Sequence, residues 1–149
     1  MLTDKRQEIL DRLSSLAIAA LGVPVYENVR RLSDLQSRPC AVLIDGDETA
    51  NENDKETSGI SPRLVTMTPE FYLITSKENS TIIRDSLNAM RVSILYAVLG
   101  DATLQALSYN RMGIEYLGCS QLLQDGRRIE AGLALRFAFT YILRYSDLS

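Results

Sequence analysis

The 149-residue chain contains no histidine. This absence removes the commonest general base, the Ser-His and Cys-His nucleophile pairs, and the commonest metal ligand. The two cysteines, Cys40 and Cys119, are far apart in sequence and form no C-x-x-C pair, which argues against structural zinc or a thioredoxin-type redox site. Both lie in strand-like surroundings, so we expect free, buried thiols, with a disulfide between them as the alternative.

Excess positive charge and long apolar runs are also missing. The formal net charge of −3 gives no basic surface for free-standing nucleic-acid binding. The longest uncharged run, Ser14–Tyr26, is too short to span a bilayer, and Asp4, Glu8 and Asp11 interrupt the N-terminal apolar pattern. We therefore expect neither a membrane segment nor a signal peptide. With 46% apolar and 23% charged residues, the chain is predicted to fold as a single domain over residues 1–149.

Two short segments resemble known binding motifs, but each lacks a residue that its motif requires. Gly113 and Gly118 have the glycine spacing of a phosphate-binding loop, but Cys119 stands where that motif requires lysine. The carboxylates after Asp45 resemble a calcium loop, but its sixth position, which must be glycine, is Ala50. We predict no catalytic, cofactor-binding or metal-binding residues, although paired carboxylates acting in acid–base chemistry remain an alternative.

The end of the chain carries the strongest pattern, a strict alternation of residue size. Side chains of a strand alternate between two faces, so this run places its bulky groups on one face and small or charged groups on the other. It predicts a long strand whose odd-numbered face is the floor of the core, with tyrosines that belong to the core or its rim. The large residues are Leu133, Leu135, Phe137, Phe139, Tyr141, Leu143 and Tyr145.

Two segments have helical periodicity. The first follows Thr3 as N-cap and ends at Gly22, and the second begins at Asn79 or Ser80 and ends at Gly100. Each has one apolar stripe that needs a partner surface. The first stripe is Ile9, Leu10, Leu13, Leu16, Ala17, Ala20 and Leu21; the second is Ile83, Leu87, Met90, Ile94 and Val98.

The remaining segments read as strands and connections, with a short helical turn at Asp101–Leu107. The expected fold is α+β: a mainly antiparallel sheet with two helices packed on one face, in the order α-β-β-β-α-β-β. Pro69 is expected at a bulge or on an edge. The expected strands are Val23–Val29, Cys40–Ile44, Arg63–Thr75, Ile114–Leu123 and the final one. A hairpin at Gln124–Arg127 joins the last two. The expected core includes Leu13, Leu16, Leu87, Met90, Ile94, Leu135, Phe137 and Phe139.

A long acidic loop is predicted at Asp45–Pro62. Loops of this length are usually functional or disordered, and a polar loop is more easily ordered by a neighbouring chain than by itself. We therefore predict that it lies, together with Arg63, at a subunit interface or along a channel. Arg30, Arg31, Arg127 and Arg128 are expected to be surface charges, some able to pair with a neighbour's acidic loop. The loop's carboxylates are Asp45, Asp47, Glu48, Glu52, Asp54 and Glu56, against one lysine, Lys55.

In layout and hydrophobic spacing, nearly the whole chain resembles the tail terminator family of tailed bacteriophages, which includes minor tail protein U. The resemblance is carried by the N-terminal Ile9-Leu10-x-x-Leu13 helix, the Pro39–Asp45 passage, the acidic hairpin loop, the helix at 83–99 with Gly100–Leu104, and the final Leu135–Tyr141 alternation.

This resemblance implies a homo-oligomeric, usually hexameric, ring without cofactors that caps the tail tube, stops its polymerisation and offers the head-docking surface. The implied partners are the tail tube protein, head–tail connector proteins, and genome DNA that passes through the channel without sequence-specific binding. The implied location is the virion tail or neck, after assembly in the host cytoplasm.

Two other functions fit the same sequence. Phage head-completion and neck connector proteins have similar α/β layouts. A small enzyme or ligand-binding α+β domain is the alternative from a different class, and a deep pocket with coupled carboxylates would favour it. A ring protein needs no active site, and a DNA conduit tolerates an acidic lining, because attraction would retain the genome.

Overall fold

The computed structural model describes residues 4–29, 31, 39–50, 62–75, 80–124, 127–144 and 148, with the backbone alone at 80, 123–124 and 127–131. The described chain has the predicted α+β class, with helices and a mostly antiparallel sheet. In order, its elements are α1 (Lys5–Leu21), β1 (Val25–Glu27), β2 (Cys40–Ile44), β3 (Glu48–Ala50), β4 (Arg63–Met67), β5 (Glu70–Ile74), α2 (Ser80–Leu99), α3 (Ala102–Leu107), a 3₁₀ turn (Tyr109–Arg111), β6 (Ile114–Gln124) and β7 (Arg127–Leu143).

The long strand β7 is the centre of the sheet. Antiparallel β6 lies along one side of it, and β5 and β4 lie end to end along the other. One register runs through both, with Met67 opposite Phe139 and Glu70 opposite Arg136. The Phe137 amide donates to the Pro69 carbonyl at 3.1 Å, so the ladder continues across the junction. The predicted strand Arg63–Thr75 is therefore divided into two strands, β4 and β5, which keep one register on β7 on either side of Pro69.

A β-bulge joins β2 to β3. Ile44 lies opposite Glu70 and Glu48 opposite Met67, so three residues on this side face two on the other. Gly46 has φ of +74° there, and a Cβ at this position would collide with the carbonyl oxygen of Thr68. The predicted loop was wrong at its start, because Glu48–Ala50 is a strand. The bulge lets the polar segment Glu48–Ala50 continue the sheet. The rest of the predicted loop up to residue 61 lies outside the described chain.

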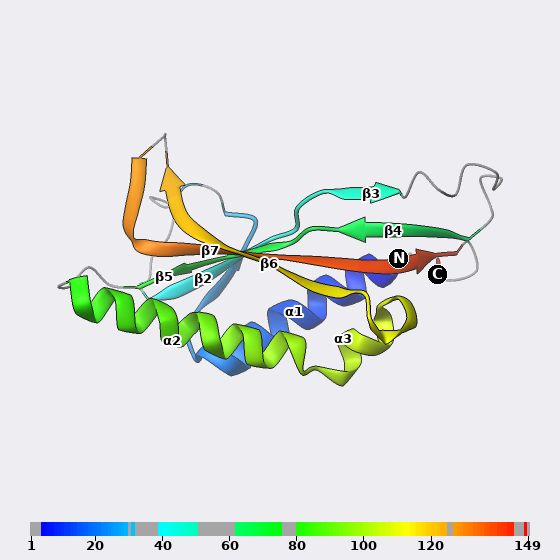
Figure 1. Ribbon diagram of the computed structural model, residues 1–149, viewed down its shortest axis with the longest axis horizontal. Helices are drawn as coiled ribbons and strands as arrows, with labels where there is room; N and C mark the ends of the chain where they lie inside the picture. The colour runs from blue at the N-terminus through cyan, green and yellow to red at the C-terminus, as the bar shows by residue number, and fades with distance from the viewer. Residues whose placement is uncertain are drawn as a thin grey trace.

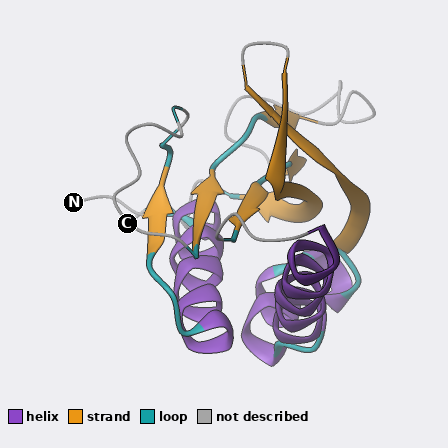
Figure 2. Cartoon of the chain, turned by 90° about the vertical axis from the view of Figure 1, so that its left-hand side faces the viewer, coloured by secondary structure: helices purple, strands orange, loops and turns teal. Residues whose placement is uncertain are grey.

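The helices α1 and α2 cover one face of the sheet (Figures 1 and 2). Phe137 lies at the centre of this core, with its ring centroid 6.3 Å from Phe71, 5.5 Å from Tyr116 and 6.2 Å from Phe139. The odd-numbered side of β7 faces the helices, as predicted. Of the expected core residues, Leu13, Leu87, Ile94, Leu135, Phe137 and Phe139 are buried, and Leu16 and Met90 are half-buried against them.

The first helix begins one residue later than predicted. Its N-cap is Asp4 rather than Thr3, and the Asp4 Oδ1 accepts a hydrogen bond from the Gln7 amide at 3.0 Å. A carboxylate is as good an N-cap as a hydroxyl and also complements the helix dipole. Gly22 ends the helix with φ of +63°, as expected.

The opposite face of the sheet has a second, smaller apolar cluster that was not predicted. Every residue of β2 is buried, because both of its faces are covered. Leu122 reaches this cluster from an irregular position in β6, where the hairpin curves (Figure 1). The buried members are Cys40, Val42, Ile44, Ile74, Leu122 and Ala134.

Both cysteines are free, which excludes a disulfide between them. Cys40 is buried as expected, but Cys119 is exposed on β6, so the prediction of a buried thiol is wrong at that position. At the far end of the hairpin, Gln124 lies opposite Arg127, which confirms the predicted turn position. No helix in the described ranges is long and apolar enough to cross a membrane.

Candidate functional site

The described start of the predicted acidic loop forms an edge of the sheet. We call Asp45, Asp47 and Glu48 the acidic edge: Asp45 is half-buried, and the other two are exposed. Arg63, half-buried, begins β4 two residues before Val65, which is the partner of Ala50. Glu52, Asp54 and Glu56 lie outside the described residues. Sequence and structure thus place three of the six carboxylates together and leave the other three untested.

Three hydrogen bonds from different parts of the chain fix the backbone of the acidic edge. Asn28, whose side-chain oxygen accepts one of these hydrogen bonds, directly follows β1. Its backbone is left-handed (φ +56°), a conformation that asparagine tolerates better than most residues. The carboxylates project from an edge whose backbone is held in place. The hydrogen bonds join the Asp45 amide to Asn28 Oδ1 (3.0 Å), Arg6 Nη2 to the Gly46 carbonyl (3.2 Å) and the Thr68 amide to the Asp47 carbonyl (3.0 Å).

Tyr141 ties the acidic edge to the core. Its side chain is fully buried on the helix side of β7, and its hydroxyl donates a hydrogen bond to Glu48 Oε1. Burial, followed by the hydrogen bond to Glu48, raises the pKa of Tyr141 far above its usual value of 10.0. The phenol is therefore held in its neutral form in the folded protein.

This raised pKa predicts a loss of stability in alkali. The unfolded chain releases the Tyr141 proton near pH 10, whereas the folded chain retains it, so stability is fully present below pH 10 and falls as the pH rises above it. We expect the free energy of unfolding to fall by about 1.4 kcal/mol per pH unit from this group. Urea unfolding between pH 8 and about 11.5 measures it.

The matched variants are Tyr141→Phe and Tyr96→Phe. Tyr96 is 86% exposed, so Tyr96→Phe removes a phenol hydroxyl from the surface rather than from the core. We expect Tyr141→Phe to flatten the alkaline loss and Tyr96→Phe to leave it unchanged. Equal pH profiles for wild type and Tyr141→Phe would contradict the assignment.

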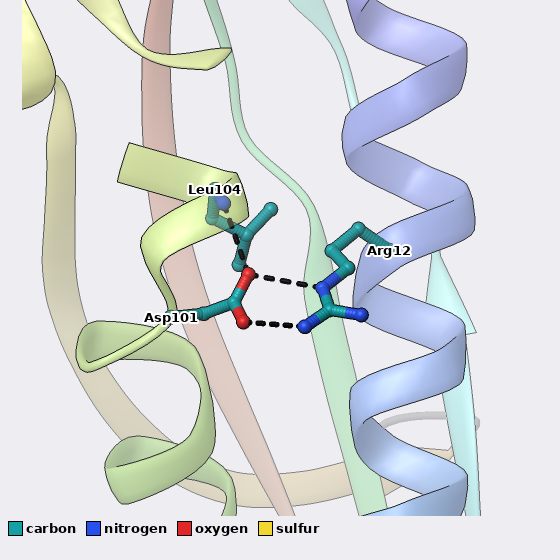
Figure 3. Close-up of polar contacts among 3 residues, drawn as sticks. All are labelled: Arg12, Asp101 and Leu104. Atoms are coloured by element: carbon teal, nitrogen blue, oxygen red, sulfur yellow. Dashed lines mark hydrogen bonds and ion pairs between the residues drawn. The ribbon is translucent and has the colours of Figure 1, made fainter. Parts of the chain in front are cut away.

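An ion pair between Arg12 and Asp101 joins α1 to the α2–α3 junction (Figure 3). Arg12 Nε donates to Asp101 Oδ2 at 3.0 Å and Nη2 donates to Oδ1 at 2.6 Å. Oδ2 also accepts from the Leu104 amide at 2.9 Å, so Asp101 is the N-cap of α3 as well. The hydrogen bond from Arg12 lowers the pKa of Asp101, whose side chain is 8% exposed. Arg12 and Asp101 thus connect α1 to the start of α3.

We expect Asp101→Ala to lower the free energy of unfolding by about 1–3 kcal/mol, because both the cap and the ion pair are lost. Asp101→Asn, which still caps a helix, should cost less. The contribution of the ion pair is present above the unfolded pKa of about 3.9 and is lost as the pH falls below it. Urea unfolding at pH 7 and pH 3 should therefore separate the variants at pH 7 and bring them closer together at pH 3.

The outward side of α2 carries an apolar stripe that sequence analysis missed. Val92, Tyr96 and Leu99 are 51%, 86% and 42% exposed. They border an open depression of about 710 Å³. The one carboxylate that lines it, Asp101, is hydrogen-bonded to Arg12. The signal was present, because these residues recur at spacings of four and three on the side of the helix opposite the core stripe.

The depression does not bring together the paired carboxylates that acid–base chemistry would need. Among the residues that the structure describes, no group of three or more Cys, Asp or Glu side chains could hold a metal ion.

No known protein family model matches the chain, and no curated protein matches it significantly.

Proposed function

We propose that this protein is a tail terminator of a tailed bacteriophage. It forms a homo-oligomeric ring, hexameric by the resemblance of its sequence, that caps the tail tube, ends tube polymerisation and provides the surface on which the head docks. The observation that carries the proposal is the α+β layer itself. Its order of elements roughly matches the one on which the resemblance rests, with the additional strand β3 and the predicted strand at 63–75 divided into β4 and β5. It has a central β7 and two helices on one face.

The edges of the sheet support assembly. Strand β6 is bonded to β7 on one side and to no other described strand, and β3 is bonded only to β4. Unpaired strand edges are natural sites of association between chains. A contact between two different edges is a head-to-tail contact, which closes into a ring when its rotation allows.

The proposed partners are the tail tube protein at one face of the ring and head–tail connector proteins at the other, with DNA passing through the centre. A surface that carries carboxylates repels DNA phosphates, so DNA would slide through such a channel rather than bind. The protein acts by occupying the growing end of the tube, which requires shape and contact area but no chemistry.

A polymerisation assay tests the role. We expect substoichiometric amounts of the protein, added to polymerising tail tube protein, to end elongation and to be found at one end of each tube by electron microscopy. Tubes that grow unchanged while the protein binds isolated connector proteins would favour the head-completion role. Binding to neither would contradict a place in the tail.

A further inference from the structure

Strand β3 has no apolar anchor in the described chain. It is three residues long, lies at the end of the sheet beyond β4 (cyan in Figure 1), and is exposed at all three positions. The other three-residue strand, β1, packs Val25 and Tyr26 against the two apolar clusters, whereas no residue of β3 belongs to either cluster. Burial of apolar surface therefore contributes little to holding β3 in place.

The chain that leads into β3 is fixed. Asp45, Gly46 and Asp47 each take part in a backbone hydrogen bond with a distant part of the chain. The positive φ of Gly46 and its close approach to Thr68 leave no room for a side chain at this point. Any movement of β3 therefore begins after Asp47.

The ladder between β3 and β4 is short. The Thr68 amide donates to the Asp47 carbonyl, and hydrogen-bonded pairs alternate with non-bonded pairs along an antiparallel ladder. Thr49 and Thr66 therefore form the next bonded pair, and it is the one such pair within the three residues of β3. Backbone pairing alone is a weak attachment for this strand.

One side-chain contact joins β3 to the core. The Tyr141 hydroxyl donates a hydrogen bond to Glu48 Oε1, and no other side chain of β3 is hydrogen-bonded to a described residue of another element. Tyr141 is fully buried on the central strand β7, so the donor is held in place. Hydrogen bonds to a charged acceptor are roughly twice as strong as neutral ones. We call this hydrogen bond the latch, because it supplies a large share of what holds β3.

We propose that β3 is a strap that opens from β4 while the rest of the sheet stays folded, with the bulge at Gly46 as its fixed end and the Glu48–Tyr141 hydrogen bond as its latch. In the open state, water replaces each partner of the latch. Segments with few buried contacts open far more often than the whole domain unfolds. The latch therefore sets how often the outer edge of β4 is uncovered. This inference concerns a single copy of the chain and does not depend on the proposed ring.

Residue-resolved amide hydrogen exchange of the full chain tests the opening. The amides of Thr49 and Thr66 report the pairing of β3 with β4. Neighbouring amides of a strand point to opposite sides, so those of Val65 and Met67 report the pairing of β4 with β7. We expect protection factors at least about a hundredfold lower at Thr49 and Thr66 than at Val65 and Met67, and insensitive to urea below the unfolding transition. Equal protection at all four amides would overturn the proposal.

A core variant separates local opening from global unfolding. Ile94 is fully buried on α2, so its contacts persist when only β3 opens. Ile94→Val lowers global stability, and we expect exchange at Val65 and Met67 to become several-fold faster. Exchange at Thr49 and Thr66 should stay unchanged. Acceleration of all four amides by the same factor would mean that β3 leaves the sheet only when the domain unfolds, which contradicts the strap.

Variants of the two partners test the latch. We expect Tyr141→Phe to accelerate exchange at Thr49 and Thr66 at least about tenfold, because it removes a hydrogen bond to a charged group. Glu48→Gln should have a smaller effect, since an amide oxygen still accepts a weaker bond. Added to Tyr141→Phe, it should have none.

Glu115→Gln is the matched control. It makes the same chemical change at an exposed position of β6 and should leave exchange at Thr49 and Thr66 as in wild type. If Tyr141→Phe also leaves these two amides unchanged, or if Glu48→Gln accelerates them equally with and without Tyr141→Phe, the latch is wrong.

Discussion

Replacing Phe137 with alanine is expected to lower the free energy of unfolding by about 3–5 kcal/mol. The Phe137 side chain is fully buried and lies between Phe71 and Tyr116. Its removal leaves a cavity lined from both the sheet and the helices, which the rigid β7 ladder cannot close. The loss is a large part of the stability of a typical domain. Urea unfolding at neutral pH, followed by circular dichroism, measures it.

Thr140→Ala is the matched control on the opposite side of β7. Thr140 is half-buried, and its Oγ1 is 3.0 Å from Oγ1 of its cross-strand partner Thr66. Losing this one hydrogen bond should cost about 0.5–1.5 kcal/mol. Similar losses for Phe137→Ala and Thr140→Ala would mean that the two faces of β7 are misassigned.

The second large effect is expected from shortening the acidic segment. Replacing residues 51–61 with Asn-Gly keeps β3, β4 and the anchored bulge and should leave the monomer folded, since loop length changes stability slowly. If the removed residues are ordered in the ring, each costs about 1–2 kcal/mol of backbone entropy, and contacts with a neighbouring chain would have to offset that cost. The shortened chain lacks those contacts. We therefore expect the shortened chain to lose assembly. A phage that carries it should make overlong tubes and tails without heads.

A control of unchanged length separates charge from length. In it, Glu52 and Glu56 become glutamine and Asp54 becomes asparagine. If contacts of the carboxylates with a neighbour matter, this variant should assemble more weakly than wild type, and added salt should weaken it less. Tails of normal length with heads that leak DNA would indicate a head-completion role. Full infectivity of the shortened phage would contradict the role given to the segment.

The parts of the fold that follow from residue periodicity were predictable. The alternation from Leu133 to Leu143 identified both β7 and its buried face. Side chains of a strand alternate between its two faces, so large residues at every second position lie on one face. The stripes of α1 and α2 were equally clear, and Gly22 marked a helix end because only a few residues adopt its positive φ readily.

Features that depend on tertiary contacts were not predictable. Glu48–Ala50 reads as a loop because its residues are polar or small, and only pairing with β4 makes it a strand. The two-sided burial of β2 depends on Leu122 from the curved hairpin, far away in sequence. Arg12 and Asp101 are 89 residues apart, and no local pattern links them.

The candidate site was partly predictable. The charge run after Asp45 located the acidic edge, whereas its anchors, Arg6, Asn28 and Tyr141, come from three separate parts of the chain and had no signal of their own. Tyr141 was expected in the core, but not as a donor to Glu48.

The mass of the native particle tests the central claim most directly. Six copies of a 16.6 kDa chain give a ring of about 100 kDa. Multi-angle light scattering at several protein concentrations, with and without tail tube protein, should therefore find a discrete species of that mass. A particle that remains at 16.6 kDa under all of these conditions would contradict the claim that the protein acts as a ring.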